Sequence, residues 1–188
     1  MANNKQEAQL IARAAGGSRS AFGDLYERHL EEIYRYIYYR VPDAVTAEDL
    51  TEEVFMRAWQ KLPETQKKNA VQNFRAWLYR IAHNRTVDYL RSAKKQIYSN
   101  LEDSVHLIEV SQTPETLLQK QQQGDILAQA IAGLDDSMQQ VILLRFVNQC
   151  SHAETAHILG LQENHVRILQ YRALKKLRSL LEQDMKNE

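Results

Sequence analysis

The sequence predicts an all-α protein of two small helical domains joined by a flexible linker, with a helix-turn-helix in the second domain. Two observations support this fold class. The 188 residues include only 3 prolines and 6 glycines, so the turns that a many-stranded β fold requires are scarce. Apolar residues recur at the three- and four-residue spacing of amphipathic helices through most of the chain.

The first half has the pattern of three helices. Apolar and aromatic residues at helical spacing run from Phe22 to Arg40. Pro42 is predicted to end this helix, because the residue before a proline is displaced from the α region. Thr46 is predicted to cap the second helix, and Pro63 to end it.

A polar segment without apolar periodicity, from Glu64 to Asn73, is predicted as a loop. Asn73 is predicted to cap the third helix. This helix has a basic run, because six Lys and Arg residues lie between Arg75 and Lys95 against a single acid, Asp88.

The helical periodicity fades from about Ser92 to Thr113, and a structureless segment of this length inside one compact domain is unusual. We therefore predict an N-terminal helical domain over 1–95, a linker over 96–113 and a C-terminal helix-turn-helix domain over 114–188. Helices in the C-terminal domain are expected at about 114–132, 136–147, 152–159 and 162–183. A capping box of Asp136 and Gln139 is expected at the second of these.

The segment from Ser151 to Tyr171 has the pattern of a helix-turn-helix. Ser151 and Glu154 form a capping box that begins a short helix, and Gly160 ends it, where a positive φ is favoured. The second helix would place its outward face in the major groove of DNA. A helical hairpin that only packs is the alternative to DNA binding, because the motif also occurs by chance.

The charge distribution supports nucleic-acid binding although the net charge is zero, with 24 basic and 24 acidic residues. A second basic run, between Arg167 and Arg178, includes no acid, whereas acids gather around 48–53. This separation predicts two nucleic-acid contacts and one protein contact. For either basic run alone, a solvated helix face is the alternative.

Several classes of protein are disfavoured. The apolar runs are too short to span a bilayer, and the first residues lack the apolar core of a secretory signal. The single cysteine, Cys150, fits a reducing cytoplasm. The six histidines lack zinc-ligand spacing, and no phosphate-binding glycine loop or nucleophile motif occurs. We expect a cytoplasmic protein without membrane insertion, cofactor, metal or catalytic residues.

Taken together, these segments resemble the bacterial RNA polymerase sigma factors of the extracytoplasmic-function (ECF) type. In the first half the resemblance rests on FGDLYERHLEEIYRYIYYR, AEDLTEEVFMRAWQKL and FRAWLYRIAHNRTVDYLR. In the second half it rests on LDDSMQQVILLRF, SHAETAHILGL and HVRILQYRALKKLRSLL. It implies a protein that binds core RNA polymerase, directs it to promoter DNA and promotes DNA opening, with an anti-sigma factor as a further partner.

The resemblance also implies roles for individual residues. The second helix would bind polymerase through Asp49, Glu52, Glu53, Phe55, Arg57 and Trp59. The polar loop and the third helix would hold the minus-ten element as a single strand through Lys67, Lys68, Asn73, Arg80, Asn84, Arg85 and Asp88. The recognition helix would contact the minus-thirty-five duplex through Asn164, His165, Arg167, Ile168, Tyr171 and Arg172. Packing in the core is an equal alternative for Phe55 and Trp59.

The alternative function is a stand-alone helix-turn-helix transcription regulator, whose first half would serve for dimerisation or sensing. Such a regulator needs no basic, aromatic helix beside a polar loop at 64–91. The sequence also departs from the family pattern, since Ile168 and Leu169 stand where serine and arginine are frequent. For that reason no promoter sequence can be transferred from better-known members.

Overall fold

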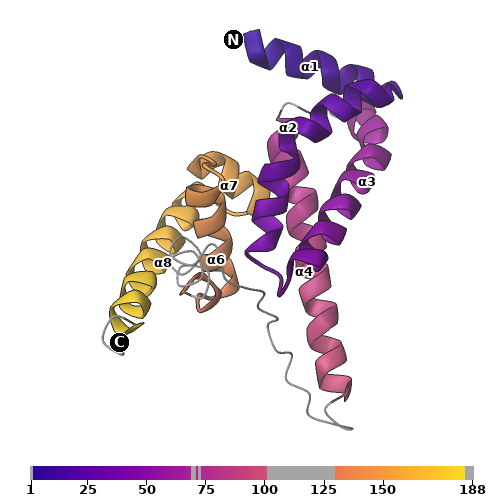
Figure 1. Cartoon of the computed structure of the whole chain (residues 1–188). Helices are drawn as coiled ribbons and strands as arrows, with labels where there is room; N and C mark the ends of the chain where they lie inside the picture. Colours follow the sequence, from indigo (N-terminus) through magenta and orange to yellow (C-terminus); the bar gives the residue numbers. More distant parts are fainter. Residues whose placement is uncertain (1, 69–70, 72, 101–129, 185–188) are drawn as a thin grey trace, which may run out of the picture. The chain divides into compact units, whose positions relative to one another are not determined.

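The computed structural model describes residues 2–68, 71, 73–100 and 130–184, and every regular element within these ranges is helical. The chain divides into two compact units, Met1–Leu107 and Ile108–Glu188. The first unit contains α1 (Ala2–Ala15), α2 (Arg19–Tyr38), α3 (Ala44–Lys68) and α4 (Phe74–Asn100). The second contains α6 (Asp136–Ile142), the π-helix η1 (Leu143–Val147), α7 (His152–Leu159) and α8 (Glu163–Asp184) (Figure 1). The predicted fold class is confirmed, whereas the exact domain limits remain a prediction.

The first unit is built on α2, α3 and α4, which pack against one another. α2 begins after Ser18, whose hydroxyl accepts a hydrogen bond from the amide of Ala21 at 3.3 Å. Its buried side includes Leu25, Ile33 and Tyr36. The ring of Tyr36 meets that of Tyr79 from α4 edge-on, with 5.5 Å between centroids, so aromatic packing joins α2 to α4.

The helix α1 was not among the predicted helices. Its residues Leu10, Ile11 and Ala14 are buried, and the helix packs against α2 and α3. The three positions have the i, i+1, i+4 spacing of one helix face, which is the signal that could have predicted it. A turn at Gly17, where φ is 94°, leads the chain into α2.

Two predicted limits of the second helix were wrong. Asp43 caps α3 instead of Thr46, because its carboxylate accepts hydrogen bonds from the amide and the hydroxyl of Thr46, each at 2.8 Å. Pro63 lies inside α3, which continues to Lys68, so residues 64–68 of the predicted loop from Glu64 to Asn73 are helical. The fully buried Leu62 holds the helix in place beside the proline, and this packing outweighs the lost hydrogen bond.

The predicted cap of the third helix is confirmed, and its predicted end was wrong. The side-chain oxygen of Asn73 accepts a hydrogen bond from the amide of Ala76 at 2.8 Å. α4 continues to Asn100, so 96–100 is helix instead of linker. Apolar periodicity fades after Ser92, but residues such as Ala93 and Lys95 have high helix propensity, which favours continuation of the helix.

The helix-turn-helix is confirmed. The Ser151 hydroxyl accepts from the Glu154 amide at 3.1 Å, and the Glu154 carboxylate accepts from the Ser151 amide at 2.8 Å, which completes the capping box that begins α7. Gly160 ends α7 at a φ of 67°. The two helices share a core of Val141, Ala156, Val166 and Leu169.

The helix predicted at 136–147 is present as α6 followed by η1. The second capping box was wrong, because Asp136 lies inside α6 and its carboxylate accepts from the Gln140 side chain at 2.7 Å. The preceding residue, Asp135, makes no side-chain capping bond. Most of the helix predicted at 114–132 lies outside the described residues.

Candidate nucleic-acid interface

The first candidate surface is the outward face of α8. The six predicted residues Asn164, His165, Arg167, Ile168, Tyr171 and Arg172 are all exposed there. Val166, Leu169 and Ala173 alternate with them and are buried, which leaves the opposite stripe open to solvent. Two of the exposed residues are large and apolar or aromatic, since Ile168 is 50% and Tyr171 71% exposed. A stripe that mixes cations, amides and apolar groups suits the edges of bases in a major groove.

An ion pair occupies the first turns of this face. A guanidinium nitrogen of Arg167 lies 2.5 Å from a carboxylate oxygen of Glu163, the first residue of α8. Both side chains are about half exposed, so the pair lies on the surface. Exposed pairs at this spacing stabilise a helix by only about 0.3–0.5 kcal/mol.

Arg145 from η1 fixes the position of α8 relative to the turn before α7. Its Nε donates a hydrogen bond to the side-chain oxygen of Gln170 at 3.1 Å, and its guanidinium also donates to the carbonyl of Cys150. Sequence reasoning did not identify this role, because Gln170 lies 25 positions from Arg145 in the sequence. The arrangement holds the recognition helix at a defined angle.

The second candidate surface follows α4. Arg80, Asn84 and Asp88 are exposed and spaced by four residues, which places them on one stripe of the helix. Lys67 and Lys68 are exposed at the end of α3, the element before it. Asn73 is exposed as well, but its side-chain oxygen already caps α4.

Arg85 differs from these predicted contacts, because it is half-buried and paired with Glu53 of α3. One of its terminal nitrogens donates to a Glu53 oxygen at 3.0 Å, and its Nε donates to the other oxygen. The hydrogen bonds from Arg85 lower the pKa of Glu53, and the same pairing raises the pKa of Arg85. In the free chain, a residue predicted to contact DNA and one predicted to contact polymerase therefore connect α4 to α3.

The third surface is the exposed side of α3, where Asp49, Glu52 and Arg57 face solvent. Phe55 belongs to the core instead, because it is only 3% exposed and its ring lies edge-on to Tyr26 with 4.7 Å between centroids. Trp59 is half-buried against Phe22, at 5.0 Å between centroids. For these two residues the core alternative agrees with the packing.

Sequence reasoning missed Met56, which is 61% exposed on α3. It follows the exposed Glu52 by four residues and Asp49 by seven, so helical spacing could have identified it. An exposed methionine beside acidic residues provides an apolar contact within a charged surface.

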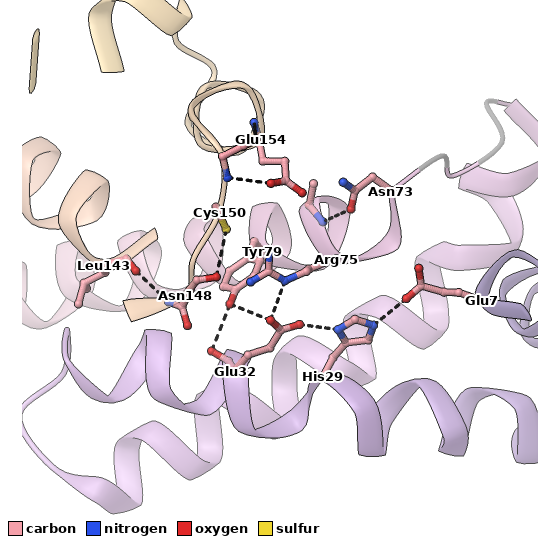
Figure 2. A network of polar contacts seen from close by, with 12 residues as sticks. Glu7, His29, Glu32, Asn73, Arg75, Tyr79, Leu143, Asn148, Cys150 and Glu154 are labelled. Atoms are coloured by element: carbon pink, nitrogen blue, oxygen red, sulfur yellow. Dashed lines mark hydrogen bonds and ion pairs between the residues drawn. The ribbon is translucent and has the colours of Figure 1, made fainter. Parts of the chain in front are cut away.

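A polar network fixes α4 against α2 and α1 (Figure 2). The buried His29 lies 3.1 Å from a Glu7 oxygen and 2.5 Å from a Glu32 oxygen. Arg75 donates to Glu32 at 2.7 Å, and the Tyr79 hydroxyl donates to the same carboxylate at 3.3 Å. Burial alone would raise the pKa of Glu32, but the hydrogen bonds from His29 and Arg75 outweigh it and lower that pKa. Arg75, part of the predicted basic run, thus stabilises the fold.

Neither a metal-binding cluster nor a membrane-spanning helix occurs within residues 2–68, 71, 73–100 and 130–184. Over these ranges no group of three or more His, Cys, Asp and Glu residues is arranged to hold a metal ion. None of the helices described above is long and apolar enough to cross a membrane.

Comparison with known families identifies both units. The profile of Sigma-70 region 2 matches residues 25–96, and that of Sigma-70, region 4 matches residues 130–179, which together make up more than half of the chain. The chain therefore has the DNA-binding and polymerase-binding modules of a bacterial sigma factor.

Curated relatives make the assignment narrower. The ECF RNA polymerase sigma factor BldN of Streptomyces coelicolor is 36% identical over 94% of this chain and 66% of its own length. The ECF sigma factor SigL of Mycobacterium tuberculosis is 30% identical over 92% of this chain and 96% of its own. RNA polymerase sigma factor YlaC of Bacillus subtilis is 28% identical over 90% and 97%. The chain belongs to the ECF RNA polymerase sigma factors, so it acts in promoter-specific transcription initiation with RNA polymerase.

Solved structures agree with this family. CnrH in complex with the cytosolic domain of CnrY superposes with a TM-score of 0.72, at 26% identity over 95% of this chain and 99% of that one. The sigma factor RpoE of Bartonella quintana, in complex with the anti-sigma factor NepR, gives a TM-score of 0.68 at 20% identity and shares the fold. The match of region 2 to the first half leaves the stand-alone regulator without support.

Proposed function

We propose that the two units divide promoter recognition between them. The N-terminal domain, over 1–95, binds core polymerase and holds the minus-ten element as a single strand. The C-terminal domain, over 114–188, binds the minus-thirty-five element as duplex, and the end of α4 with the segment up to 113 connects the two domains. The observation that carries this proposal is the separation of exposed polar residues onto α4 in one unit and α8 in the other.

On α8 the exposed residues suit a duplex. Arg167 can pair with the O6 and N7 acceptors of a guanine, and Ile168 can contact a thymine methyl group. The exposed Lys175 and Arg178 lie further along the helix, where they would contact phosphates and add affinity without sequence information.

On α4 the exposed stripe suits unpaired bases. Asn84 offers both a donor and an acceptor to the edge of a base, and Arg80 offers a cation to the backbone. Lys67 and Lys68 add charge at the end of α3. The pairing of Arg85 with Glu53 makes Arg85 a residue that positions α4, so we propose a direct DNA contact for Asn84 before Arg85.

On α3 the acidic residues Asp49 and Glu52 and the exposed Met56 suit a basic partner surface with an apolar centre, and we propose core polymerase as that partner. Family membership supports an anti-sigma factor as a further partner. It equally supports a cytoplasmic protein that initiates transcription without catalysing a reaction of its own.

The test is run-off transcription with core polymerase and the Arg167→Ala variant. Loss of one guanine contact is expected to reduce transcription from the cognate promoter roughly 5- to 150-fold while polymerase binding is unchanged. Arg178→Ala is the comparison variant, because Arg178 also pairs with a glutamate four residues away but lies 11 positions further along α8. Its proposed contact is with phosphates, so this variant is expected to lower transcription from every promoter sequence alike. Loss of polymerase binding in Arg167→Ala would contradict the placement of α8 on DNA.

A further inference from the structure

We propose that Glu163 determines promoter specificity, by accepting a hydrogen bond from a cytosine amino group in the major groove while it holds Arg167 against the neighbouring guanine. The inference rests on the proposed binding of α8 to duplex DNA. It adds a residue that was not among the predicted contacts, and it makes Glu163 and Arg167 one recognition unit.

The geometry places the carboxylate at the bases. Glu163 is the first residue of α8, and the N-terminal turns of a recognition helix approach the base edges most closely. Its Oε1 lies 2.5 Å from the Arg167 guanidinium, so any base within reach of Arg167 is close to the carboxylate. The guanidinium has five N–H donors and the carboxylate can accept about four hydrogen bonds, so both groups can stay paired and still bind bases.

The charge of Glu163 explains why it would select a base. A carboxylate that enters the groove loses water and meets acceptor atoms on most bases. Guanine presents O6 and N7, and thymine presents O4, all of which repel it. Adenine offers an amino group beside the acceptor N7, whereas cytosine offers its amino group without that neighbour. Cytosine is therefore the base that satisfies Glu163.

A contribution to the stability of α8 is a weaker explanation of the Glu163–Arg167 ion pair than base selection. Both side chains are about half exposed, and pairs of this kind contribute little to folding. An acid in the first turn favours the helix through the dipole, but a glutamine at the same position would not repel bases. The functional consequence of the negative charge is the exclusion of wrong bases, which is specificity through repulsion.

The experiment uses the full chain bound to core polymerase and a promoter pool in which every base pair of the minus-thirty-five element is randomised. Run-off transcripts are sequenced for the unchanged protein, Glu163→Gln and Glu163→Ala. We expect the unchanged protein to prefer cytosine at one position next to a guanine by about tenfold, and both variants to lose that preference. Preferences at the minus-ten element should not change.

The matched control is Glu182→Gln. Glu182 pairs with Arg178 at 2.7 Å across the same four-residue spacing, but it lies about 28 Å further along the helix, at a rise of 1.5 Å per residue. Its replacement is expected to leave every base preference as it was. This control separates the loss of an i,i+4 ion pair from the loss of a group at the bases.

Two results would overturn the inference. One is an unchanged base preference in Glu163→Ala at every position. The other is an equal change in transcription from all sequences, which would show that the charge acts only through the phosphates. If instead the unchanged protein shows no preference anywhere in the minus-thirty-five element, the proposed function of α8 itself is wrong.

Discussion

Replacing Phe55 by alanine is predicted to destabilise the first unit strongly without removing a specific polymerase contact. The side chain is 3% exposed, and its ring packs edge-on against Tyr26. Truncation of a buried phenylalanine costs about 3–5 kcal/mol, of which the aromatic pair accounts for roughly 0.5–1.5 kcal/mol. Because whole domains are stable by only about 5–15 kcal/mol, the variant would lose a large part of the stability of this unit.

The protein provides a selective probe for this measurement. Its two tryptophans, Trp59 and Trp77, both belong to the first unit, so tryptophan fluorescence during urea unfolding reports on that unit alone. With an unfolding slope of about 2 kcal/mol per molar urea, the midpoint is expected to fall by roughly 2 M. Met56→Ala is the control, because that neighbouring side chain is 61% exposed and its loss should hardly change the midpoint.

When polymerase binding is measured on folded protein, Met56→Ala and not Phe55→Ala should be the variant with weaker binding. Met56→Ala is expected to weaken binding, whereas Phe55→Ala at low urea and low temperature should bind in proportion to the fraction that is folded. If Phe55→Ala kept its unfolding midpoint and lost polymerase binding, the assignment of Phe55 to the core would be refuted.

Three further predictions concern the polar groups. The folded protein lowers the pKa of Glu32 below its ordinary 4.5. The contribution of Glu32 to stability should therefore be complete above about pH 4.5 and disappear as the pH falls through the lowered pKa. Urea midpoints should fall more steeply on acidification in the unchanged protein than in Glu32→Gln. Ser151→Ala should destabilise α7 by about 1 kcal/mol, visible as faster amide hydrogen exchange in that helix, and Ser151→Asp should restore it. Asn84→Ala should reduce permanganate reactivity of promoter thymines, a measure of opening, more than closed-complex binding; equal losses would contradict its role at an unpaired base.

The helices that bury a continuous apolar stripe were predictable from the sequence, and their ends were less so. The ends of α7 are set by local chemistry, the Ser151 capping box and the left-handed Gly160, and both were predicted. The ends of α3 and α4 depend on packing and propensity. Pro63 is tolerated because Leu62 is buried beside it, and α4 extends past Ser92, where the apolar periodicity of the sequence fades. Neither effect leaves a periodic signal.

The exposed stripe of α8 was predictable for a similar reason. Burial alternates with a helical period there, so the residues that are not in the core must face solvent. The partners of individual charges were not predictable, since they come from other helices. Glu53 and Arg85 are 32 positions apart in the sequence, and Glu32 and Arg75 are 43 apart.

These ion pairs divide the cations of the basic run on α4 into half-buried partners of acids and exposed residues. As a sequence it has six cations and one acid, which indicates a single DNA-facing patch. In the fold, Arg75 and Arg85 turn toward Glu32 and Glu53, where they fix α4 against α2 and α3. Arg80 stays exposed, on the same stripe as Asn84. The acids that neutralise the chain overall therefore do not oppose DNA binding uniformly. Some of them hold in place the helix whose remaining face we propose to bind the unpaired strand.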